Sequence, residues 1–212
     1  MQGSTIDSAN VVELEHSADD HAAEHHDAHH SEHPDLRVFG LLVFLGSEGM
    51  LFMGLFAAYL TFRAVAPAWP PEGTPELETL LPAINTVILV SSSFVIHQAD
   101  HAIKKDDIKA VRWWFLATFL MGATFLAGQV YEYMHLEFGL TSSLFASTFY
   151  VLTGFHGFHV FVGLTLIAIM GIKSFKPGAF LGGKHFGIEA ASIYWHFVDV
   201  IWIVLFLMLY IL

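Results

Sequence analysis

The sequence predicts an all-α integral membrane protein, a bundle of five transmembrane helices. Hydrophobic residues make up 55% and charged residues 14% of the 212 residues, and the mean hydropathy is +0.57, which excludes an ordinary soluble domain. Five apolar runs each reach the roughly 20 residues that cross a bilayer core as a helix. These runs lack the period of two that marks a strand, so they are helices. We expect the spans at about 37–63, 81–102, 112–134, 145–172 and 187–211.

Loop residues bound these runs in order along the chain. A segment rich in proline and glycine at 66–75 follows the first run, and Pro82 stands in the first turn of the second, where a missing N–H is tolerated. The polar segment 104–109 separates the second run from the third. Lys176, Pro177 and Gly178 end the fourth.

The basic residues predict the orientation of the helices. Eight of the nine lie at one membrane side if five spans are counted, and Arg63 is the exception on the other side. The eight are Arg37, Lys104, Lys105, Lys109, Arg112, Lys173, Lys176 and Lys184. Because basic residues accumulate on the cytoplasmic side, we expect the N-terminus in the cytoplasm and the C-terminus outside.

Residues 1–35, which precede the bundle at 36–212, show no apolar periodicity. They hold nine of the twenty acidic residues and seven of the fourteen histidines, which predicts a disordered, cytoplasmic tail. The composition does not resemble a secretory signal. His-rich tracts bind metal ions weakly, and the candidates are His25, His26, His29 and His30. Their irregular spacing favours a solvated, proton-buffering tail over a dedicated metal site.

Composition also excludes several kinds of chemistry. The chain has no cysteine, which rules out disulfides, thiolate nucleophiles and cysteine-ligated metal centres. It contains no glycine-rich loop of the kind that cradles phosphates, and no nucleic-acid partner is expected. The membrane histidines do not show the spacing of a haem or copper centre. We predict no catalytic residue and no resident metal.

Glu48 is the intramembrane residue that most needs an explanation. It lies 11 residues after Arg37, and at about 1.5 Å per residue this places it about 16 Å into the membrane. A carboxyl group at that depth must be protonated, or it must meet a partner from another helix or a lipid headgroup. Glu48 is therefore a candidate for a proton-linked or lipid-linked role.

Four further polar residues are expected at a similar depth. His156 and His159 are three apart in the fourth span, and His196 and Asp199 are three apart in the fifth, so each pair is expected on one helix face. Together with Glu48 they predict a polar network between helices. The alternative is that the histidines are structural hydrogen-bonding groups. Asn85 and the serines 91–93 are expected to make ordinary polar contacts between helices.

Glu132 lies with Gln129 and Glu137 towards the outer end of the third span. Residues there are often solvated at the membrane interface, which is one interpretation of this carboxylate.

Five motifs, one per span, resemble cytochrome c oxidase subunit III and occur in the order of that family. They are Ser47-Glu48-Gly49-Met50-Leu51-Phe52, Leu81-Pro82-Ala83-Ile84-Asn85-Thr86, Gln129-Val130-Tyr131-Glu132-Tyr133, Thr153-Gly154-Phe155-His156-Gly157-Phe158-His159-Val160 and Tyr194-Trp195-His196-Phe197-Val198-Asp199-Val200-Ile201-Trp202. The resemblance covers residues 37–212 and fits the short bacterial form, whose five helices correspond to the last five of the seven-helix form. The two missing helices leave half of that form's lipid cleft without a wall.

The resemblance implies a non-catalytic subunit of a proton-pumping haem–copper oxidase in aerobic respiration. Haem and copper would belong to the partner subunits I and II, and cytochrome c would be met through the complex. The family is associated with bound phospholipid, sustained proton uptake and protection of the catalytic subunit. The family's carbodiimide-reactive carboxylate falls on Glu48, and motif positions fall on His156, His159, His196, Asp199 and Glu132. The membrane would be the bacterial plasma membrane or another energy-transducing membrane such as the thylakoid.

Two alternatives stay open at this point. One is the equivalent subunit of a quinol oxidase, because the electron donor is determined by other subunits. The other is an autonomous proton or cation transporter that uses Glu48 and the His-rich tail. A transporter of that kind would be active when purified alone and would show an internal repeat.

Overall fold

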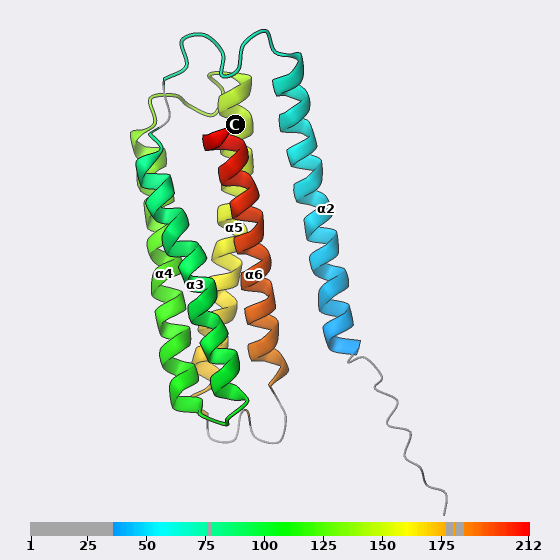
Figure 1. Cartoon of the computed structure of the whole chain (residues 1–212), viewed down its shortest axis with the longest axis vertical. Coiled ribbons are helices and arrows are strands. Elements are labelled where there is room, and N and C mark those ends of the chain that lie inside the picture. Colours follow the sequence, from blue (N-terminus) through cyan, green and yellow to red (C-terminus); the bar gives the residue numbers. More distant parts are fainter. Residues whose placement is uncertain (1–35, 76–77, 177–179, 181–184) are drawn as a thin grey trace, which may run out of the picture. The chain divides into compact units, whose positions relative to one another are not determined.

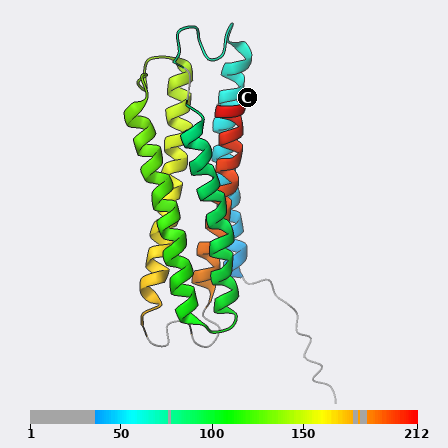
Figure 2. The ribbon, with the colours of Figure 1, turned by 60° about the vertical axis from the view of Figure 1, so that its left-hand side comes forward.

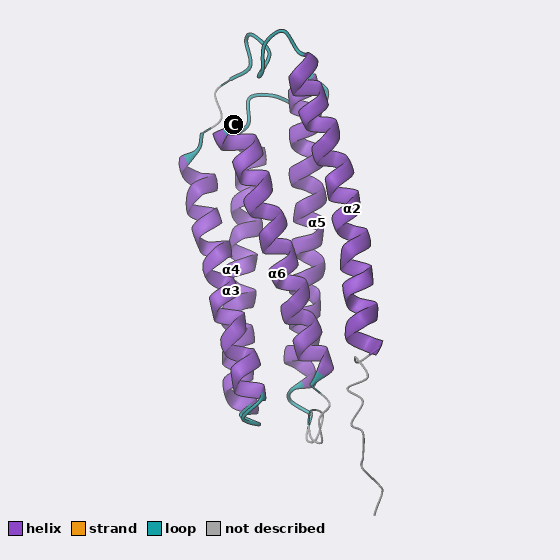
Figure 3. Cartoon of the chain, turned by 45° about the vertical axis from the view of Figure 1, so that its right-hand side comes forward, coloured by secondary structure: helices purple, strands orange, loops and turns teal. Residues whose placement is uncertain are grey.

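The computed structural model describes residues 36–75, 78–176, 180 and 185–212, and this part of the chain contains helices and loops without a strand (Figure 3). The helices are α2 (Leu36–Val65), α3 (Leu80–Ile103), α4 (Ile108–His135), α5 (Leu144–Lys173) and α6 (Phe186–Phe206), and α6 continues into a π-helical turn, η1 (Leu207–Ile211). Five of these segments are long and apolar enough to cross a membrane. The predicted five-helix fold is therefore confirmed.

Four of the helices form an antiparallel bundle. α3 packs against α4, α4 against α5, α5 against α6, and α6 closes the ring against α3. Figure 2 shows the paired α3 and α4 with their short connection at the lower end. α2 lies outside this ring against α6 and α5, on the right-hand side of Figure 1. Its position leaves most of its apolar surface exposed.

Most of the basic residues lie at one end of the helical unit. The loop after α3 carries Lys104 and Lys105, α4 begins with Lys109 and Arg112 in its first turns, and α5 ends at Lys173. The first residues of α2 lie at this same end, which we call the basic end (Figure 1). Arg63 lies at the opposite end of α2.

α4 begins at Ile108, four residues before the predicted start. The side chain of Asp107 accepts a hydrogen bond from the backbone N–H of Ala110 at 3.0 Å, so it caps the helix. The start at residue 112 was predicted from hydropathy, which does not detect a helix whose first turn is polar. Such a helix start is predicted from an N-cap residue, here Asp107, and not from hydropathy.

Trp195 fixes the centre of the bundle. Its side chain is fully buried, and its indole N–H donates to the Ser92 hydroxyl of α3 at 2.8 Å. Gly163 of α5 and Gly122 of α4 leave room for the ring, because a Cβ at Gly163 would lie 2.9 Å from Cε3 and one at Gly122 would lie 2.5 Å from Cη2. Three helices therefore approach α6 around one aromatic side chain.

The end of α2 opposite the basic end is attached to the last residues of the chain. The Tyr59 hydroxyl donates to the carbonyl of Met208 at 3.0 Å, and the Trp69 indole N–H donates to the Tyr59 oxygen at 3.1 Å. The Arg63 guanidinium donates to the carbonyl of Leu212. These contacts hold α2 against η1.

Candidate functional site

A carboxyl group and an imidazole meet in the middle of the helical unit. Glu48 of α2 and His159 of α5 are joined by a contact of 3.1 Å between Oε2 and Nε2. The two side chains are 19% and 6% exposed. The ring centroids of Phe52 and Phe155 lie 5.0 and 4.6 Å from that of His159. Glu48 thus meets a residue of another helix, one of the arrangements expected for a carboxyl group at its depth.

The two contacts of the His159 ring determine how many protons the pair holds. Nδ1 lies 2.8 Å from the carbonyl oxygen of Phe155, which can only accept, so Nδ1 carries a hydrogen. Nε2 can then bond to Glu48 only if one proton lies between them, on the carboxyl group or on the ring. Both arrangements are neutral overall. The Glu48–His159 pair is therefore a one-proton site.

His156 does not join this pair. Its side chain is fully buried, with its ring centroid 4.9 Å from Trp202 of α6 and 5.9 Å from Phe125 of α4. Neither ring nitrogen has a hydrogen-bond partner among the described residues. His156 and His159 are three apart on α5, so they differ by roughly 60° around the helix. That angle directs the two rings to different neighbours.

His196 and Asp199 of α6 share one hydroxyl group on α3. Ser93 Oγ lies 3.0 Å from Nδ1 of His196, and it also donates to Oδ2 of Asp199. The other Asp199 oxygen is buried and has no partner within the described ranges. The two residues therefore share one partner, Ser93, and form a group distinct from Glu48 and His159. The polar contact expected of Ser93 is present.

Glu132 is buried, so the interpretation of this residue as solvated at the interface was wrong. Its Oε2 accepts from the Gln129 amide at 3.1 Å, and its Oε1 accepts from the Tyr210 hydroxyl at 2.7 Å. Tyr210 lies in η1, and the contact therefore joins α4 to the last turn of the chain. Sequence alone could not place Tyr210 beside the third span.

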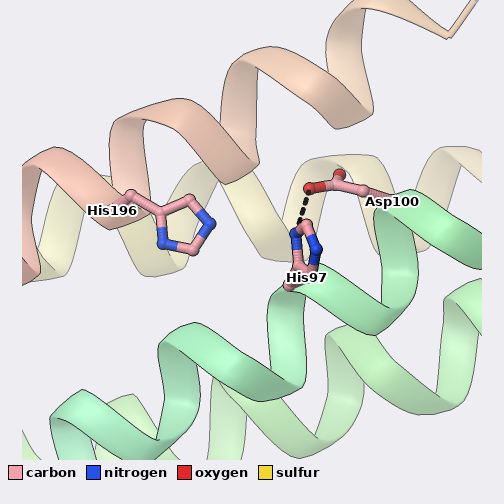
Figure 4. Close-up of side chains that lie close together, drawn as sticks. All are labelled: His97, Asp100 and His196. Atoms are coloured by element: carbon pink, nitrogen blue, oxygen red, sulfur yellow. Dashed lines mark ion pairs between the residues drawn. The ribbon is translucent and has the colours of Figure 1, made fainter.

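A further group contains two residues that no sequence pattern had indicated. His97 and Asp100 of α3 lie beside His196 of α6, and one ligand atom from each of the three lies within 4.8 Å of the others (Figure 4). Nδ1 of His97 is 4.0 Å from Oδ2 of Asp100. The available signal was the spacing of three in α3, but it falls near the end of a span, where polar residues are ordinary.

An apolar groove lies between α4 and α5 at the basic end. Its volume is about 550 Å³, and its lining includes Phe115, Phe119 and Ile167, with Lys109 and Arg112 at one end. Arg112 is held by Ser174, because Nε donates to Oγ at 3.1 Å and Nη2 donates to the carbonyl at 2.5 Å. The groove thus combines hydrocarbon walls with cationic groups.

The tail candidates His25, His26, His29 and His30 lie outside the described residues. The structure therefore adds nothing to the prediction of weak metal binding there.

The fold and these polar groups define a multi-pass membrane protein with carboxyl and imidazole groups between its helices. A family model described as cytochrome c oxidase subunit III matches residues 18–212. Cytochrome c oxidase subunit 3 of Synechocystis sp. is 59% identical over 183 residues, which cover 86% of this chain and 78% of that protein. The subunit 3 of Thermostichus vulcanus is 59% identical over 184 residues, which cover 87% of this chain and 91% of that protein. The subunit 3 of Arabidopsis thaliana is 38% identical over 192 residues, which cover 87% of this chain and 72% of that protein.

The chain belongs to the cytochrome c oxidase subunit III family. It is an integral protein of a bacterial or thylakoid membrane.

Proposed function

We propose that this chain is subunit III of a proton-pumping haem–copper cytochrome c oxidase and that it holds no redox centre itself. Its partners are the catalytic subunit I and subunit II, which carry the haem and copper, and cytochrome c delivers electrons to the complex. The observation that carries the proton-linked part is the Glu48–His159 contact, whose two hydrogen bonds fit one proton shared between the two side chains. The separation of His156 from His159 supports the absence of a haem or copper centre, because such centres need imidazoles that converge.

Glu48 and His159 can exchange a proton without creating net charge inside the membrane. Moving the proton along the 3.1 Å contact from the carboxyl group to Nε2 converts a neutral pair into a carboxylate and an imidazolium, which together are also neutral. A second proton would leave an unpaired positive charge in a pocket walled by Phe52 and Phe155, which is costly. The pair therefore suits a supporting role in proton uptake better than a role in multi-proton transport.

The groove between α4 and α5 supports the lipid-binding part of the proposal. Its walls match acyl chains, and Lys109 and Arg112 at the basic end match the phosphate of a phospholipid. Arg112 is fixed by Ser174 and lies 4.3 Å from the centroid of the Phe175 ring, so its charge is positioned before a lipid arrives. We assign an anionic phospholipid to this groove.

Purification of the chain from native membranes tests the proposed assembly. An affinity tag on this chain should recover a complex that contains haem, consumes oxygen and accepts electrons from reduced cytochrome c. The isolated chain should show no haem absorption and no oxygen uptake. Haem bound stoichiometrically to the isolated chain would contradict the proposal.

The same preparation separates the two alternatives. A complex that oxidises quinol but not cytochrome c would identify the quinol-oxidase branch. Proton movement across vesicles that contain the chain alone would identify an autonomous transporter.

A further inference from the structure

We propose that His97, Asp100 and His196 form a divalent metal site suited to Zn²⁺ between α3 and α6. The site lies towards the basic end, away from the Glu48–His159 pair on α2 and α5. Two imidazoles and one carboxylate are a ligand set that zinc accepts, with water completing the coordination. The proposal stands independently of the oxidase function.

The three side chains converge from two helices. His97 and Asp100 are one turn apart on α3, and the outer edge of the His196 ring points towards His97 across the interface (Figure 4). Ligand atoms of a tetrahedral zinc ion lie roughly 3.4 Å apart, whereas here they lie within 4.8 Å. The separations between the ligand atoms must shorten by up to about 1.4 Å on binding. His97 can supply that movement, because its side chain is 57% exposed.

Ser93 prepares the His196 ring for metal binding. Its single hydroxyl hydrogen is donated to Asp199, so its oxygen can only accept from Nδ1 of His196. Nδ1 must therefore carry the ring hydrogen, which leaves the lone pair on Nε2, the nitrogen that faces the cluster. A hydrogen bond from the far ring N–H to an oxygen acceptor orients metal-binding histidines, and Ser93 supplies such an acceptor here.

Asp100 has one oxygen without a partner. Oδ2 accepts from the Ser192 hydroxyl at 2.6 Å, which orients the carboxylate. Oδ1 is buried and makes no hydrogen bond in the described part of the chain. A buried carboxylate oxygen without a partner is costly, and a cation bound by both oxygens of this carboxylate would remove that cost. The orphaned oxygen is independent of the histidine geometry and also indicates a cation.

The choice of zinc follows from the donor types. Imidazole nitrogen favours zinc, copper and nickel over magnesium and calcium, which prefer oxygen ligands. A tetrahedral site is compatible with two helices, whereas a square-planar copper site needs four ligands in one plane. Bound zinc would join α3 to α6, the two helices that Ser93 and Ser192 already connect.

The test uses the full-length chain, purified by an affinity tag without histidines together with whatever subunits accompany it. The seven tail histidines are replaced by glutamine in every sample, because they would bind zinc nonspecifically. Samples are equilibrated with zinc, passed through a desalting column and measured for zinc per chain by mass spectrometry. We expect the parent protein to bind one more zinc ion per chain than the His97→Gln and Asp100→Asn variants. X-ray absorption should report imidazole nitrogen and carboxylate oxygen at about 2.0–2.2 Å.

Two further variants make the result specific. His101→Gln alters another exposed histidine, one turn along α3, whose ring centroid lies 4.6 Å from that of His97. This variant should retain zinc. Ser93→Ala keeps all three ligands but removes the group that fixes the His196 tautomer, and it should weaken binding about 10- to 100-fold. Equal zinc in His97→Gln, Asp100→Asn and the parent protein would overturn the proposal. Loss of zinc in His101→Gln would overturn the assigned ligand set.

Discussion

Nε2 of His159 lies 3.1 Å from Oε2 of Glu48, and the opposite ring nitrogen is bonded to the carbonyl of Phe155. These two contacts make the pair neutral with one proton. Charge neutrality explains how a carboxyl group can lie between membrane helices without a lysine or arginine beside it.

Glu48→Gln should remove the main intramembrane site of carbodiimide labelling. A hydrophobic carbodiimide reacts with a protonated carboxyl group, and Glu48 carries the proton in one of the two neutral arrangements of the pair. Glutamine keeps the volume and can donate its amide hydrogen to Nε2 of His159, so the oxidase should assemble with its haems intact. Peptide mapping by mass spectrometry measures the label. Asp199→Asn is the control and should remain labelled at Glu48, whereas a label found mainly on Asp199 or Glu132 would show that the site assignment is wrong.

His159→Phe should destabilise the attachment of α2. The same substitution should be less destabilising in a protein that already carries Glu48→Gln. The single change leaves a carboxyl group without its partner, and the second change replaces that group by a neutral amide. We expect a coupling free energy of about 1 kcal/mol, the range of hydrogen bonds between membrane helices. Thermal unfolding of the four proteins in detergent, analysed as a double-mutant cycle, measures this energy. Simple additivity would mean that the contact contributes nothing.

Gly163→Ala should lower the stability of the bundle by about 1–3 kcal/mol, because the new methyl group has no space. Its Cβ would lie 2.9 Å from the buried Trp195 ring, whereas at Gly157 of the same helix the nearest atom is 3.9 Å away. Gly157→Ala is therefore the control and should leave the melting temperature almost unchanged. If both variants unfold at the same temperature, Trp195 can move and the bundle is less tightly packed than described.

Lys109→Gln should reduce the amount of anionic phospholipid that copurifies with the complex. Lys109 lines the groove between α4 and α5, whereas Lys105 lies in the preceding loop and does not line it. Lys105→Gln removes the same charge at the same end and should keep the lipid. Native mass spectrometry, with lipid extraction and quantification, distinguishes a lipid held in the groove from general attraction to the basic end. An equal loss in both variants would favour general attraction.

Deletion of residues 1–33 should leave assembly intact and alter the pH dependence of oxygen consumption. Histidines titrate near neutral pH, so a tail with seven of them can collect protons near the uptake side. The deletion should lower the rate of oxygen consumption more above about pH 7.5, where protons are scarce, than at about pH 6. A full-length variant with the seven histidines replaced by glutamine separates their effect from that of chain length. An unchanged profile in both would mean that the tail does not deliver protons.

The sequence predicted the elements better than their contacts. Five apolar runs were sufficient for five helices, because a membrane leaves the backbone few alternatives. Depth placed Glu48 and His159 at one level, but whether their helices adjoin depends on packing that no local pattern encodes. His97 and Asp100 were missed because they lie in the last two turns of α3, where polar residues are expected. Glu132 was misjudged for a related reason, since its partner Tyr210 lies 78 residues later.

The attachment of α2 to η1 has a consequence for how the protein is made. α2 leaves the ribosome before α5, α6 and η1, which supply its main contacts among the described residues. Glu48 therefore enters the bilayer without His159, and Tyr59 without Met208. Newly inserted α2 must be retained by the insertion machinery, a partner subunit or lipid until the last helix is synthesised. Ribosomes that stall before residue 186 would produce chains in which this helix has none of its final neighbours on α6.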